Sequence, residues 1–209
     1  MRHHLPPCSV CGSRRQRPEC NQCALRTQVL AGSAEEQHRF FDAERVALMQ
    51  KPRTPVELAG MPLTVALVSC GAFKRKEPGP HRAADLYIGR LFKLAFWHAI
   101  DHHDDVMILS ALHGLVPPHQ ELEPYDYAMH QMTRQERGEW GKTVVGELMT
   151  HYPMTRLQLT LFAGQAYTQP VVAAISRAHI QHWGLSQPLQ GLDLFERMAW
   201  FKRFKEEDS

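Results

Sequence analysis

Thr64-Val-Ala-Leu-Val-Ser69 is a run of β-branched and small apolar residues, and it decides the fold class. Two more largely apolar runs of similar length follow, at Val106–Ala111 and Leu157–Ala163. Apolar residues on both faces of such short runs indicate strands that are buried inside a parallel sheet. These three runs therefore predict the central strands of one sheet.

Longer segments with helical periodicity separate these strands. We expect helices over residues 85–103, 133–151 and 168–183, and a last one over 193–205. The second has the clearest start, because Thr133 with Glu136 three residues later is typical of a capping box. Strands that alternate with helices predict an α/β fold, a three-layer α/β/α sandwich with a mostly parallel sheet and right-handed crossovers.

The composition is that of a folded globular protein: 209 residues, 44% hydrophobic and 22% charged. No apolar run approaches the ~20 residues that span a bilayer, and Met1-Arg-His-His4 does not begin a signal peptide. These features predict a cytoplasmic protein with no membrane partner. We divide it into residues 1–30, a linker helix and loop at 31–62, and an α/β domain at 63–209.

Four of the five cysteines lie close together near the N-terminus, as two Cys-x-x-Cys pairs. Two such pairs can close a tetrahedral sulfur shell around zinc. We therefore predict a structural zinc module over residues 1–30, with the ligands Cys8, Cys11, Cys20 and Cys23. The module is either only a structural clip or also a nucleic-acid contact.

The charge distribution bears on the second possibility. The net charge of the chain is only +2, but residues 1–30 hold five arginines against one glutamate. Three of them, Arg14, Arg15 and Arg17, lie between the cysteine pairs. Guanidinium groups there would be free to bind phosphates.

Polar residues gather after each predicted central strand, where ligands bind in open parallel sheets. Such residues follow the strands at 64–69, 106–111 and 157–163. The candidates for the substrate site are Ser69, Cys70, Gly71, Lys74, Ser110, His113, Gly164, Gln165 and Tyr167. Cys70 is either a packed residue or a nucleophile, with His113 as its obvious base.

Two further segments carry groups that can act chemically. Asp85-Leu-Tyr87 opens the predicted helix after the first strand, so Asp85 is either a cap or a site residue. Asp126 lies in the long connection after the second strand, as a turn residue or a site residue. We interpret the histidines and aspartates at 98–105 as a solvated polar cluster and not as a metal site.

Several strings occur together in this chain. They are Val68-Ser-Cys-Gly71 with Lys74, Asp85-Leu-Tyr87, Leu109-Ser-Ala-Leu-His-Gly-Leu115, Pro124-Tyr-Asp126, Ala163-Gly164 with Tyr167, and Pro188-Leu-Gln-Gly-Leu192 with Glu196-Arg197. With them, about residues 63–201 resemble a family of small bacterial and phage proteins of unknown function. The architecture of that family is similar to the uracil-DNA-glycosylase-like fold and to a domain of archaeosine synthase.

This resemblance implies nucleobase chemistry, and the relatives to which it points most directly are antiphage DNA glycosylases that remove modified bases from viral DNA. The family motif falls on Ser69, Cys70, Gly71, Lys74, Asp85, Tyr87, Ser110, His113, Gly114, Tyr125, Asp126, Gly164 and Tyr167. The Gly-Gln-Asp-Pro-Tyr string of uracil-DNA glycosylases is absent, so the resemblance does not extend to uracil as the substrate.

We therefore expect a DNA glycosylase that flips a modified base out of DNA and hydrolyses its N-glycosidic bond. Asp85 or Asp126 would stabilise the sugar cation or orient water, and His113 or Lys74 would neutralise the departing base. Tyr87 or Tyr167 would stack on it. Two other classes stay open: a tRNA base-modifying enzyme related to archaeosine synthesis, and a non-enzymatic zinc-dependent adaptor that binds nucleic acid or protein.

Overall fold

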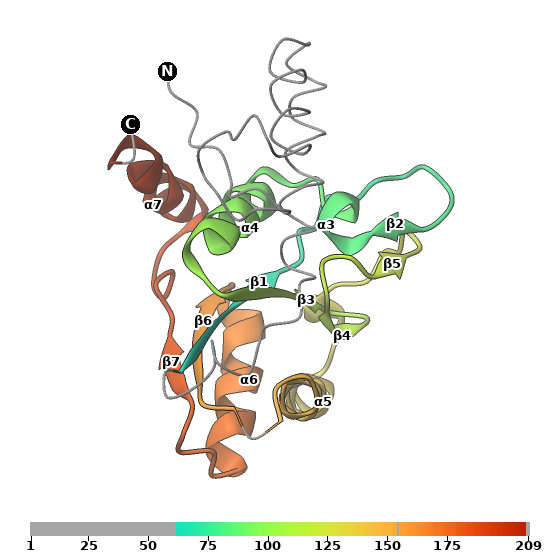
Figure 1. Ribbon diagram of the computed structural model, residues 1–209. Coiled ribbons are helices and arrows are strands. Elements are labelled where there is room, and N and C mark those ends of the chain that lie inside the picture. Colours follow the sequence, from blue (N-terminus) through green and yellow to red (C-terminus); the bar gives the residue numbers. More distant parts are fainter. Residues whose placement is uncertain (1–61, 154, 208–209) are drawn as a thin grey trace, which may run out of the picture. The chain divides into compact units, whose positions relative to one another are not determined.

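The β1 strand (Leu63–Ser69) lies at the centre of a five-stranded sheet in the computed structural model. The structure describes residues 62–153 and 155–207, without the side chains of 202 and 204–207. The strand order is β4-β3-β1-β6-β7 (Figure 1). The other four strands are β3 (Asp105–Ser110), β4 (Gly114–Val116), β6 (Leu157–Phe162) and β7 (Gly184–Ser186). The α/β class and the mostly parallel sheet are confirmed.

The register places the carboxyl ends of three strands at one edge of the sheet. β1 pairs in parallel with β3, where Ser69 lies opposite Leu109, and with β6, where Val68 lies opposite Phe162. β6 is also parallel to β7, whereas β4 runs antiparallel to β3. Three-residue strands such as β4 and β7 are too short to show a pattern in the sequence, so both were missed.

Side chains of β1 alternate between the two faces of the sheet. Val65 and Leu67 belong to the core cluster that also contains residues of α5 (Arg134–His151) and α6 (Gln165–Arg177). Ala66 and Val68 are fully buried but lie outside that cluster. Figure 1 shows α4 (Arg90–His102) on the side of the sheet opposite α5 and α6, an arrangement compatible with three layers.

The helix predicted over 85–103 is wrong at its start. Two helices occupy this region, α3 (Ala83–Leu86) and α4, with Tyr87 between them. The backbone here leaves the helix to pair with the segment after β1: the Arg75 amide donates to the Leu86 carbonyl at 2.9 Å, and the Ile88 amide donates to the Phe73 carbonyl at 3.0 Å. Such long-range bonds leave no local signal.

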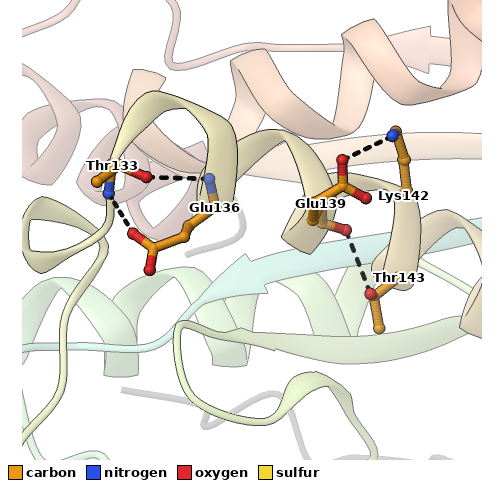
Figure 2. A network of polar contacts seen from close by, with 5 residues as sticks. All are labelled: Thr133, Glu136, Glu139, Lys142 and Thr143. Atoms are coloured by element: carbon orange, nitrogen blue, oxygen red, sulfur yellow. Dashed lines mark hydrogen bonds and ion pairs between the residues drawn. The ribbon is translucent and has the colours of Figure 1, made fainter.

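The capping box predicted for α5 is confirmed (Figure 2). Thr133 Oγ1 accepts from the Glu136 amide at 3.2 Å, and a Glu136 carboxylate oxygen accepts from the Thr133 amide at 2.6 Å. One turn further on, Lys142 forms an exposed ion pair with Glu139, whose carbonyl oxygen also accepts from the Thr143 hydroxyl. Local sequence therefore defines where this helix begins.

The last two helices differ from the predicted ranges at their ends. α6 begins at Gln165 instead of 168 and ends at Arg177, before His179, which has a positive φ of 53°. α7 covers Leu194–Glu207, and Asp193 and Glu196 form a reciprocal pair of hydrogen bonds at its start. Phe201 of α7 is buried against Phe162, at a ring-centroid distance of 5.5 Å.

Smaller elements complete the described residues: a two-stranded antiparallel sheet of β2 (His81–Arg82) and β5 (Glu121–Leu122), and a short 3₁₀ helix η1 (Met129–Gln131). None of the helices in the described ranges has the length and apolar character that crossing a membrane requires. The predicted zinc module at 1–30 and the linker at 31–62 lie outside the described residues, apart from Pro62.

Candidate functional site

The candidate site lies where the strand order changes direction. From β1 the chain goes first to β3 on one side, and only later to β6 on the other side. Crossovers in opposite directions leave a crevice beyond the carboxyl ends of the strands, and this is the usual ligand site of open α/β sheets. Cys70, directly after β1, lies at this point, and its amide donates to the Leu109 carbonyl at 2.9 Å.

Tyr125 is the centre of a network of hydroxyl groups at this crevice. Its Oη lies 2.8 Å from Ser110 Oγ and 2.8 Å from Tyr87 Oη. Both partners are fully buried, and Ser110 Oγ also accepts from the His113 amide at 3.0 Å. The network therefore joins the end of β3 to the segment between α3 and α4.

Cys70 connects this network to the end of β6. Its Sγ lies 3.2 Å from Tyr167 Oη, near the start of α6, and 3.9 Å from Tyr125 Oη. Trp140 of α5 supports both ends, because its Nε1 donates to the Ser110 carbonyl at 2.9 Å and its ring packs on Tyr167. The site is thus held by residues that follow all three central strands.

Lys74 brings a positive charge to the network. Its Nζ lies 4.4 Å from the centroid of the Tyr125 ring, within the range of a cation–π contact. A backbone bridge between Lys74 and Tyr87 fixes this part of the loop after β1. Among the described residues no carboxylate pairs with Lys74, so its ammonium is available to a ligand.

The phenols of the network stay protonated at neutral pH. Burial raises the pKa of Tyr87 to about 12, and burial together with the nearby Cys70 raises the pKa values of Tyr125 and Tyr167 as well. Partial desolvation also lowers the pKa of His113, which favours its neutral form although the side chain remains exposed. The network thus offers neutral hydroxyl donors, and Lys74 supplies the cation beside it.

A cavity of about 380 Å³ adjoins the network, and Cys70 belongs to its lining. This volume lies within the ~300–1,000 Å³ common for small-ligand pockets. Arg90 and Arg197 add two guanidinium groups to its lining. Most of its walls are apolar, formed by Ala72, Phe73, Leu91, Phe92, Ala95, Phe162, Ala163, Leu189, Leu194 and Met198.

The predicted site residues fall into three groups. Cys70, Tyr87, Ser110 and Tyr167 form the network with Lys74 at its side, and the His113 ring meets the Tyr125 ring edge-on at 5.1 Å. Ser69, Gly71 and Gly164 line the cavity, as Cys70 also does. Gln165, Asp85 and Asp126 neither share in the hydrogen bonds of the network nor line the cavity.

The capping role considered for Asp85 is wrong, because Asp85 lies inside α3. Its carboxylate accepts from the guanidinium of Arg82 at 2.7 Å. Asp126 follows Tyr125 in the chain and is exposed, without a hydrogen bond among the described residues. Asp126 is thus the unpaired carboxylate of the two.

The pairing of Cys70 with His113 as nucleophile and base is absent. The thiol contacts two phenols, and the exposed His113 ring contacts the Tyr125 ring. Phenols that remain protonated are poor bases. The structure therefore gives no support to a cysteine nucleophile.

Sequence reasoning missed part of the site. Tyr125 was identified only through the motif of the resemblance and not as a site residue, and Trp140 was not among the candidates. Arg90 follows Gly89 at the start of α4, and Arg197 lies in the string Glu196-Arg197. No local pattern indicates that either arginine faces a cavity.

The predicted metal and nucleic-acid ligands near the N-terminus cannot be placed in this site. Arg14, Arg15, Arg17 and the four cysteines Cys8, Cys11, Cys20 and Cys23 lie outside the described residues. Within the described ranges, no group of three or more His, Cys, Asp or Glu side chains is arranged to hold a metal ion.

Fold and site together define an α/β protein with a ligand-sized cavity at the switch point of its sheet. Residues 65–203 match the model of a family described as "Family of unknown function (DUF6884)". Since this match covers more than half of the chain, the protein belongs to that family. Neither the search of curated proteins nor the search of solved structures found a match.

Proposed function

We propose that this protein is a DNA glycosylase that accepts an extruded, modified base at the carboxyl ends of β1, β3 and β6. The observation that carries the proposal is the network of neutral hydroxyl groups next to an apolar cavity of about 380 Å³, with Lys74, which pairs with no carboxylate of the described residues, beside the network. A base inside a duplex cannot reach such a site, so the nucleotide must be flipped.

The cavity and the network suit different parts of a base. Apolar side chains such as Phe92 and Phe162 offer contact to its faces. Tyr125, the half-buried member of the network, can offer its hydroxyl to the edge of the base, and the fully buried Ser110 orients that hydroxyl. Because the raised pKa of Tyr125 keeps its phenol protonated, this donor is retained throughout the physiological range.

Bond cleavage places opposite charges on the two products. The base leaves with the bonding electron pair, and the Lys74 ammonium and phenol O–H groups stabilise that negative charge. Water attacks C1′ of the sugar while a carboxylate takes its proton. Asp126 is better suited to this role than Asp85, since Asp85 is already paired with Arg82.

The test is base release. The purified full-length chain is incubated with phage DNA that carries modified bases and with unmodified DNA, and abasic sites are detected by alkali-induced strand breakage. We expect abasic sites in the modified DNA, with the free base identified by mass spectrometry. If no DNA yields abasic sites, the proposal fails, and base release from tRNA alone would make the protein an RNA-directed enzyme.

Two carboxylate variants test the mechanism. Asp126→Asn should lower the rate of base release about 100-fold or more at unchanged DNA affinity, because a transition-state contact is lost without loss of binding. Asp85→Asn should have a smaller effect. Equal effects, or an effect of Asp126→Asn on affinity alone, would contradict this assignment.

The finer parts of the prediction belong to the same proposal. We propose that the α/β/α layers are of the uracil-DNA-glycosylase-like type, which the sequence strings imply and with which the mostly parallel sheet is compatible. We also propose that Cys8, Cys11, Cys20 and Cys23 bind a structural zinc ion and that Arg14, Arg15 and Arg17 contact phosphates.

A further inference from the structure

An exposed aromatic residue followed by three consecutive cations lies beside the cavity. The segment Phe73-Lys-Arg-Lys76 follows β1, and one carboxylate, Glu77, comes after it. The Phe73 side chain is 72% exposed, although large aromatic side chains usually bury their surface. The proposed function does not use Phe73, Arg75 or Lys76.

The exposure of Phe73 does not come from a loose loop. Two backbone hydrogen bonds hold the segment: the Ile88 amide donates to the Phe73 carbonyl at 3.0 Å, and the Arg75 amide donates to the Leu86 carbonyl at 2.9 Å. The phenyl ring lies over Gly89, where an added Cβ would come within 3.7 Å of Phe73 Cδ2. The ring is thus presented to solvent from a fixed backbone.

The position of the ring relates it to the cavity. Phe73 and Leu194 both line the cavity, and both remain more than half exposed, so they form part of its mouth. Arg75 Nε donates to the Asp85 carbonyl at 2.9 Å, which leaves its terminal nitrogens unused by any hydrogen bond in the described residues. Lys76 is exposed, and no carboxylate in the described residues pairs with it.

We propose that Phe73–Lys76 binds the DNA strand at the mouth of the cavity: Phe73 stacks on a base next to the extruded nucleotide, and Arg75 and Lys76 bind the flanking phosphates. Aromatic stacking combined with backbone phosphate contacts is how proteins hold nucleic acid without reading its sequence. This inference rests on the proposed function, and it places DNA binding in the α/β domain in addition to the N-terminal arginines.

Binding of an uncleavable ligand tests the inference apart from catalysis. The probe is a fluorescein-labelled duplex with one tetrahydrofuran abasic analogue, titrated with the full-length chain at several salt concentrations. Phe73→Ala should weaken binding about 5- to 150-fold with little change in salt dependence, since a stacked base contributes about 1–3 kcal/mol. The double variant R75Q/K76Q should lower the slope of log K against log[salt] by about 1–2, since each phosphate contact contributes ~0.9.

Two matched controls come from the same domain. Phe195→Ala removes an equally exposed phenyl, 75% exposed, that does not line the cavity. Arg177→Gln removes an exposed cation from the last turn of α6, at the opposite end of that helix from Tyr167. Both should bind the probe like the wild type.

The outcomes separate this inference from the proposed function. If the Phe73 and Arg75/Lys76 variants bind like the controls, the inference is overturned, whatever the wild type does to modified DNA. If they lose affinity as expected but the wild type releases no base from any DNA, the binding surface stands and the glycosylase proposal fails. If the wild type does not bind the probe, the inference is overturned, and the base-release assay alone decides the glycosylase proposal.

Discussion

Replacement of Tyr125 by phenylalanine tests whether the hydroxyl groups act as one network. Tyr125→Phe keeps the ring but removes the Oη that lies 2.8 Å from both Ser110 Oγ and Tyr87 Oη. Two short hydrogen bonds between partly or fully buried groups are lost, each with a net contribution of about 0.5–1.5 kcal/mol, together with the long contact to Cys70 Sγ at 3.9 Å, which adds little. We therefore expect the free energy of unfolding to fall by about 1–3 kcal/mol.

A double-mutant cycle with Tyr87 gives the sharper result. Tyr87→Phe removes only the bond between the two phenols and should cost about 0.5–1.5 kcal/mol. In the double variant that shared bond is lost once, so the combined cost should be less than the sum by about 0.5–1.5 kcal/mol. Urea denaturation of the four proteins, followed by a spectroscopic probe, measures all these terms.

The control is Tyr127→Phe, because Tyr127 packs against the core and its hydroxyl forms no hydrogen bond among the described residues. We expect a change within about 0.5 kcal/mol. The reasoning is refuted if Tyr87→Phe costs more than Tyr125→Phe, or if the two costs add without coupling. Either result would mean that the hydroxyl groups do not stabilise one another.

Four further predictions follow from the site and the fold. Lys74→Gln should lower base release about 100-fold while Lys74→Arg retains part of it, because a developing negative charge loses its cation. A protein–DNA adduct trapped by borohydride in the wild type but not in Lys74→Gln would instead show that the Lys74 amine attacks the sugar. Burial raises the pKa of Tyr87 to about 12, above the value of about 10 for an unfolded chain. The contribution of the protonated Tyr87 phenol to stability is therefore complete below about pH 10 and is lost as the pH rises toward 12, so urea midpoints measured across this range should fall less in Tyr87→Phe than in the wild type. Thr133→Ala should reduce the free energy of unfolding by about 1 kcal/mol through loss of the α5 cap, whereas Lys142→Gln, which removes only an exposed ion pair, should change it by less than about 0.5 kcal/mol (Figure 2). Equal effects of the two variants in thermal melts would argue against capping. Elemental analysis of the full-length protein should find about one zinc per chain, and Cys20→Ser should lose it; a metal-free wild type purified without chelator would contradict the zinc module.

Local chemistry was sufficient for much of the fold. The apolar run at Thr64–Ser69 and its two counterparts became β1, β3 and β6, since a strand covered on both faces needs apolar residues throughout. Thr133 and Glu136 defined the start of α5, because a capping box depends on residues only three positions apart. The small and polar residues that follow the strands also predicted the edge of the sheet at which the hydroxyl network and the cavity lie.

The partners of those residues depended on tertiary structure. Cys70 contacts Tyr167, which is 97 positions away, and not His113. The reason is that β1 pairs with β6 as well as with β3, so the residues after β6 also lie beside the end of β1. Tyr87 leaves the expected helix because the backbone after β1 pairs with it. A sequence records which groups follow each strand, whereas strand order and register decide which of them come within hydrogen-bonding distance.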